Sequence, residues 1–114
     1  MTPPDDPACE TFVRTVLDLY RRTPGTTGHI RPADRRLARD LYGRGVCVRT
    51  VHDALLLASA RRFARPMTSH PPATARSLAY FLPVVDELLA APIDDSYRRH
   101  LTHALERALS RPPS

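Results

Sequence analysis

The segment VRTVHDALLLASARR, residues 48–62, carries the clearest information on the fold of this 114-residue chain. Apolar residues recur in it at the spacing of three and four that forms one face of a helix: Val48, Val51, Ala54, Leu55 and Ala58. Leu56, Leu57 and Phe63 fall outside this stripe, so the segment is apolar on more than one side. Such a helix lies at the centre of a bundle or presents a second face to a partner. We therefore expect 48–62 to be the least exposed helix of the fold.

Four other helical segments flank this one, separated by turns that contain proline and glycine. They are expected at residues 7–22, 32–42, 77–90 and 94–110. Pro32 occupies the favoured first position of the second segment, and Gly43 and Gly45 end it. Ser77 is the expected cap of the third, and Pro83 should kink or split it. Because the alternating pattern of strands is missing, the sequence predicts an all-α fold.

The length allows one domain and is too small for two separate cores. We expect residues 1–114 to form a single compact bundle of about five helices, with flexible ends at 1–6 and 111–114. Cys9 and Cys47 lack the spacing of a metal or redox site, and we interpret both as buried or half-buried apolar residues. Residues 1–7 are acidic rather than basic, and no apolar run is long enough for a membrane span. A cytoplasmic protein without membrane contact is expected.

The positive charge of the chain is concentrated in its middle third. All 17 cations are arginine, and the net charge is +5. Residues 31–65 hold nine arginines against three aspartates, whereas cations and acids nearly cancel on both sides of this region. A GC-rich coding bias explains the preference for arginine over lysine. It does not explain the localisation, which favours a polyanionic partner.

The first candidate site consists of four arginines at the start of the second helical segment: Arg31, Arg35, Arg36 and Arg39. The last three fall within an arc of about 100° on the helix. Cations are unfavourable near a helix N-terminus, and only Asp34 offsets them. Guanidinium groups together with free backbone N–H groups would form a phosphate site there. The alternative is an ordinary solvated helix face.

The second candidate is the sequence LARDLYGRGVCVRTVHDAL, residues 37–55, which contains Arg44 and Arg49. Its order of helix, glycine turn and helix resembles the helix-turn-helix unit of transposase and recombinase DNA-binding regions. The resemblance implies contact with DNA. A recognition helix needs polar side chains on its outer face, whereas Leu56, Leu57 and Ala60 lie between Arg49 and Arg61. A purely structural helical hairpin is therefore the alternative.

Two further groups of cations complete the candidate list. Arg61, Arg62 and Arg65 end the central helix, where they either contact phosphate or simply complement the helix dipole. A secondary phosphate contact or a solvated face is expected for residues that share one arc of the last helix: His100, His103, Arg107 and Arg111. No third ligand accompanies the two histidines, so we expect neither a metal site nor a cofactor.

The sequence gives little support for catalysis. The loop at 23–28 lacks the Gly-Lys-Ser/Thr ending of a nucleotide-binding loop. Cys47 and His52 could meet across a turn, but no third group orients them. We expect no enzyme.

A second resemblance concerns RSLAYFLPVVDEL, residues 76–88. Its Ser-x-x-Tyr-Phe helix looks like the closing helix of small domains in phage and plasmid replication proteins, DnaD-like modules among them. The resemblance spans residues 33–90 and implies a role in DNA transactions.

The sequence therefore favours a non-enzymatic, nucleic-acid-binding accessory protein, with a bacterial mobile element or a replication system as its setting. Arginines would contact phosphates with weak sequence preference, and DNA is favoured over RNA. The alternative is a helical module for protein–protein interaction, as a homo-oligomer or a subunit of a larger complex. In that case the excess apolar surface of 48–62 would form the interface.

Overall fold

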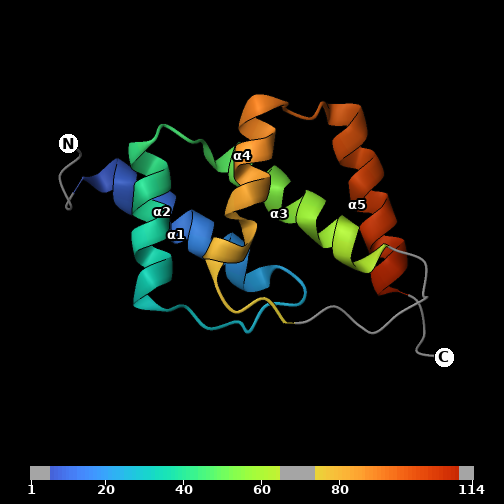
Figure 1. The fold of residues 1–114 in the computed structure, drawn as a ribbon, viewed down its shortest axis with the longest axis horizontal. Helices are drawn as coiled ribbons and strands as arrows, with labels where there is room; N and C mark the ends of the chain where they lie inside the picture. The colour runs from blue at the N-terminus through green and yellow to red at the C-terminus, as the bar shows by residue number, and fades with distance from the viewer. Residues whose placement is uncertain (1–5, 65–73, 111–114) are drawn as a thin grey trace.

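The computed structural model describes residues 6–64 and 74–110, which form five α-helices and one short 3₁₀ helix (Figure 1). In chain order these are α1 (Pro7–Arg22), α2 (Pro32–Gly43), α3 (Val48–Phe63), η1 (Leu78–Phe81), α4 (Leu82–Ala90) and α5 (Asp95–Leu109). The described residues contain no β-sheet; one isolated bridge joins Thr26 to Ala75. The all-α prediction is confirmed. Most of the expected flexible ends lies outside the described residues, but Asp6 is placed and caps α1 with a hydrogen bond from the backbone N–H of Ala8.

The helix boundaries follow the local signals in the sequence. The Ser77 hydroxyl accepts a hydrogen bond from the backbone N–H of Ala79, and Asp94 accepts one from that of Tyr97 at 2.7 Å. Pro83 divides the segment 77–90 as expected, because its ring permits a helix start but not a helix interior. The chain forms the tight turn η1 before it and α4 from Leu82 onward.

The turn after α2 also has a specific geometry. Gly45 adopts a positive φ of 79°, which glycine tolerates without steric cost. The backbone N–H of Val46 then donates a hydrogen bond to the carbonyl of Leu41, and the backbone N–H of Gly45 donates one to the carbonyl of Tyr42. This pair of bonds is the Schellman ending, which satisfies carbonyl groups that a helix end leaves unpaired. It ends α2 and redirects the chain into α3.

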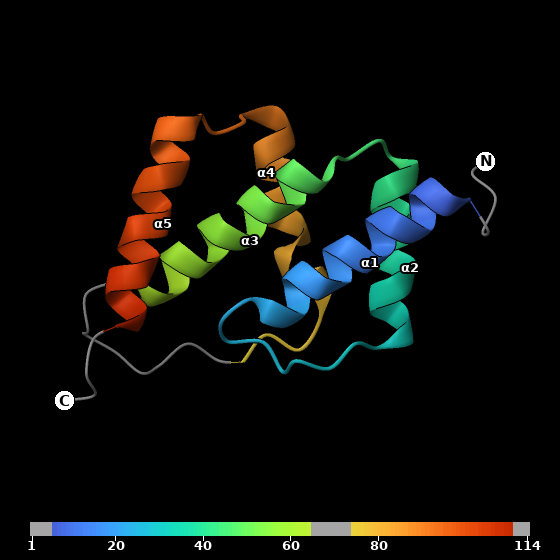
Figure 2. The same cartoon turned by 180° about the vertical axis from the view of Figure 1, so that it is seen from behind.

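α3 is the central helix, and α1, α4 and α5 pack against it (Figure 2). Nine of its 16 residues are buried, whereas only one of the 15 residues of α5 is. Leu57 and Ala60, which fall on the second apolar side, are both buried within this chain. The prediction that this helix is the least exposed is confirmed. Leu56 and Phe63, the other residues outside the main stripe, are half-buried.

α2 lies at one end of the long axis and α5 at the other, with α3 between them (Figures 1 and 2). Ala38 and Leu41 are the buried apolar residues of α2, which packs against α1 and η1. Its opposite face is left to solvent. α3, by contrast, is largely covered, and its exposed cations Arg49 and Arg61 are both engaged with acids on α4 or α5.

An ion-pair network fixes α5 to α3. Both nitrogens of one edge of the Arg98 guanidinium donate to the Asp53 carboxylate, at 2.7 and 2.8 Å. Arg98 also contacts Asp95, and His52 lies 3.3 Å from the Asp53 carboxylate. Burial alone raises the pKa of Asp53, but the hydrogen bonds from Arg98 and His52 outweigh it and hold this pKa below its usual value.

The two cysteines have different environments. Cys9 is buried in the core as expected. Cys47 is exposed, so the prediction of a buried or half-buried residue is wrong there. The reason is its position as the N-cap of α3, where its sulfur lies 3.3 Å from the Thr50 hydroxyl. That hydrogen bond lowers the pKa of the thiol.

Candidate functional site

The structure divides the nine candidate arginines of residues 31–65 into distinct groups. Three of them extend from the turn before α3 or from α3 itself to acids on the next helices. They are Arg44 with Asp86 and Arg49 with Asp95, each at 2.8 Å, and Arg61 with both oxygens of Glu87, at 2.9 and 2.5 Å. The hydrogen bonds from Arg61 hold the pKa of Glu87 below its usual range. These cations are already partnered within the chain.

Arg62 forms a second group by itself. Its side chain is 9% exposed, and its guanidinium lies 5.2 Å from the Phe63 ring centroid and 5.1 Å from that of Tyr80. This is the geometry of a cation held against two aromatic faces. Arg62 is therefore part of the packing rather than a free surface charge. Arg65 lies outside the described residues.

The remaining candidates are Arg31, Arg35, Arg36 and Arg39, the N-cap and three residues of α2. All four are exposed. Within residues 6–64 and 74–110 their guanidinium groups form no ion pair. We call these four residues the α2 arginine face.

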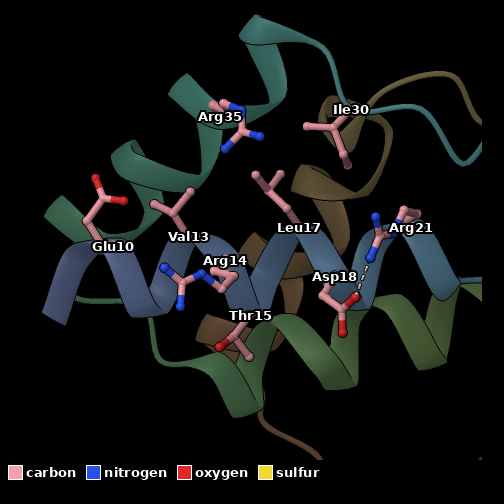
Figure 3. A pocket seen from close by; sticks show the side chains of 9 residues that line it. All are labelled: Glu10, Val13, Arg14, Thr15, Leu17, Asp18, Arg21, Ile30 and Arg35. Carbon is pink, nitrogen blue, oxygen red and sulfur yellow. Dashed lines mark hydrogen bonds and ion pairs between the residues drawn. The ribbon is translucent and has the colours of Figure 1, made fainter. Parts of the chain in front are cut away.

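One side of this face borders a groove of about 610 Å³ between α1 and α2 (Figure 3). Val13 and Leu17 of α1 and Ile30 of the preceding loop supply its apolar lining. Arg35 reaches into the groove from α2, and Arg14 and Arg21 approach from α1 (Figure 3). The groove contains acids too, Glu10 and Asp18, and Arg21 pairs with Asp18 at 2.8 Å.

The other side of the face borders a second groove, of about 430 Å³, between α2 and η1. Arg36 and Arg39 line it together with Asp40, and the other side is lined by Ser77, the N-cap of η1, and Ala79 of η1. The α2 arginine face thus runs from one groove to the other across the outside of the helix. A chain of phosphates could contact it along this whole width.

The N-terminus of α2 differs from the expected phosphate site. Asp34 is completely buried there and accepts hydrogen bonds from the backbone N–H groups of Arg31 and Leu78, both at 2.9 Å. The Ser77 hydroxyl donates a third bond to the same carboxylate at 3.2 Å. Pro32 has no N–H group to offer. The N-terminal end of α2 thus already holds a buried carboxylate of the protein itself.

The secondary candidates lie on α5, at the far end of the molecule from α2 (Figures 1 and 2). His100, His103 and Arg107 are exposed, and Arg111 lies outside the described residues. The His100 ring stacks on Tyr97 at a centroid distance of 6.0 Å. The structure does not bring this set together with the α2 arginine face.

The described residues contain no group of three or more possible metal ligands. The suggested pair of Cys47 and His52 is not formed either, because the first contacts Thr50 and the second contacts Asp53. Among the helices of residues 6–64 and 74–110, none is long and apolar enough to cross a membrane.

Comparisons with known proteins do not identify this chain. No family model, no curated protein and no solved structure matches it.

Two arginines that belong with the α2 arginine face were missed by sequence reasoning. Arg14 lines the α1–α2 groove opposite Arg35, and Arg76 directly precedes Ser77 at the α2–η1 groove. Both are exposed, and neither forms an ion pair with another described residue. The distribution of net charge did not indicate these two arginines, because each lies in a segment where the numbers of cations and acids are nearly equal. The signal that could have found Arg14 is its place on the polar side of the helix at 7–22.

Proposed function

We propose that this protein binds nucleic acid through its phosphate backbone, without catalysing a reaction, and that the α2 arginine face is the contact surface. One observation carries the proposal. The exposed arginines of the central region that lack an ion pair within the described residues gather on one helix, whereas Arg44, Arg49 and Arg61 are neutralised by acids.

The chemistry of these side chains supports a phosphate ligand. A guanidinium group is permanently charged and presents a planar fork of donors that matches phosphate oxygens. Arg35, Arg36 and Arg39 lie on the outside of α2 and need not break an internal ion pair to bind. Contacts of this kind are insensitive to base sequence, and DNA and RNA both provide them. The resemblances to DNA-binding domains favour DNA.

The proposal is tested by the salt dependence of binding. In the variant Arg35→Gln/Arg36→Gln/Arg39→Gln, glutamine keeps helix propensity while three positive charges are removed. Each lost phosphate contact reduces counterion release. We expect the slope of log affinity against log salt to flatten by nearly three units on duplex DNA, or by about two on single strands.

A control variant separates the role of position from that of total charge. Arg44→Gln/Arg49→Gln/Arg61→Gln removes the same number of charges, but from residues that are paired within the chain. This control should keep the parent's salt slope. Equal slopes for the parent and the α2 variant would reduce the α2 arginine face to a solvated surface. A parent that binds no nucleic acid at low salt would overturn the proposal altogether.

A further inference from the structure

Tyr80 is a large, exposed aromatic side chain on η1, the element that packs against α2. It belongs to η1, and 52% of its surface is exposed. It directly follows Ala79, which lines the α2–η1 groove with Arg36 and Arg39. η1 itself is held against α2 by the hydrogen bonds that Asp34 accepts from Ser77 and Leu78. The ring is thus attached to the same rigid unit as the arginines.

The orientation of the Tyr80 ring is fixed by its neighbours. Phe81 meets it edge-on at a centroid distance of 5.1 Å and an interplanar angle of 75°. The Arg62 guanidinium lies 5.1 Å from its centroid. Arg62 is in turn packed against Gly25, where an added Cβ would lie 3.0 Å from a guanidinium nitrogen. A ring held in this way loses little conformational entropy when a ligand stacks on it.

Tyr97 provides an internal comparison. It is also exposed, at 45%, but it lies on α5 next to Asp94 and Asp95 and stacks on His100. Asp95 is paired there with Arg49 and Arg98. Of the two exposed tyrosines, Tyr80 is the one whose element packs against α2, which carries the α2 arginine face; α5, which carries Tyr97, packs against α3.

From this juxtaposition we infer that the protein prefers single-stranded nucleic acid, with one unpaired base stacked on Tyr80. The inference rests on the proposed function, because Arg36 and Arg39 would hold the phosphates of the same strand. Combining a basic groove with an aromatic platform is how proteins bind single strands without reading sequence. The faces of bases in a duplex are covered by their neighbours, so a duplex offers Tyr80 nothing to stack on.

The inference is tested with three ligands of equal length at one salt concentration: a single-stranded oligonucleotide, the same oligonucleotide with abasic sites, and a duplex. The parent should bind the intact single strand most tightly. Tyr80→Leu should weaken binding of the intact strand about 5- to 150-fold, the range of one lost base–aromatic stack, and leave binding of the abasic strand unchanged. Tyr80→Phe should restore most of the affinity, and the matched control Tyr97→Leu should bind like the parent.

A spectroscopic readout reports the stacking directly. The chain contains no tryptophan, so Tyr80→Trp introduces a single indole. Its fluorescence should be quenched by the intact strand and not by the abasic strand. The inference is overturned if the parent binds abasic and intact strands equally, or binds duplex as tightly as single strand; phosphate binding as proposed would then still stand. If the parent binds none of the three ligands, both the proposed function and this inference fail.

Discussion

Replacing Asp34 tests how α2 and η1 are joined. Asp34→Ala removes the acceptor of two backbone N–H groups, those of Arg31 and Leu78, and of the Ser77 hydroxyl. A buried donor left without an acceptor costs about 1–3 kcal/mol. The Leu78 bond is buried and should cost this in full, whereas the Arg31 bond is only partly buried and water can replace part of it. We expect a loss of about 2–4 kcal/mol in the free energy of unfolding.

Asp34→Asn provides a graded comparison. One oxygen remains and can still accept from Leu78 and Ser77, but the new amide group donates and so cannot accept from Arg31. The loss should be about 1 kcal/mol. Asp40→Asn is the control, because Asp40 is exposed on the same helix and forms no ion pair within the described residues. Urea unfolding followed by circular dichroism measures all three. A parent-like stability of Asp34→Ala would show that this carboxylate does not join the two elements.

Three other predictions concern the rest of the fold. Leu55→Ala creates a cavity beside the central helix and should cost about 2–5 kcal/mol, which a thermal melt detects; an unchanged melting temperature would contradict the position of the core. The fold lowers the pKa of Asp53, so its ion pair with Arg98 contributes its full stabilisation at pH values above the unfolded-state pKa. This stabilisation is lost as the pH falls below about 4 and through the folded-state pKa. Asp53→Asn should therefore be less stable at neutral pH and change less in that acidic range when unfolding is measured as a function of pH. Cys47 should react with iodoacetamide in the native protein at a pH where an ordinary thiol reacts slowly, and Cys9 should react only after unfolding. Mass spectrometry of the alkylated peptides measures the order of labelling, and labelling of Cys9 before Cys47 would contradict the prediction.

The sequence predicts the helices of this protein well because their boundaries depend on local chemistry. Pro83 and Gly45 act within a few residues, and the stripe of apolar residues in 48–62 reports burial without knowledge of the partner helices. The expected segment begins at Val48, as α3 does, and the exposure of Cys47 was missed because cysteine was interpreted as a small apolar residue and not as the N-cap before that helix.

The site was harder to predict, because the pairing of charges depends on tertiary structure. Arg44 and Arg49 form ion pairs with acids that are 42 and 46 residues away along the chain, and no local sequence pattern indicates such pairs. Asp34 similarly acquires its role from Leu78, 44 residues later. The sequence therefore identifies the candidate arginines, but only the tertiary structure shows which of them form ion pairs within the chain.

We propose that the α2 arginine face, and not the paired arginines, contacts phosphate. The most direct measurement follows the Nε–H resonances of the arginine side chains by NMR while a short oligonucleotide is added at low salt. We expect the resonances of Arg35, Arg36 and Arg39 to shift progressively, while those of Arg49 and Arg98, which are held by Asp95 and Asp53, stay in place. Shifts confined to the paired arginines, or spread evenly over all of them, would contradict it.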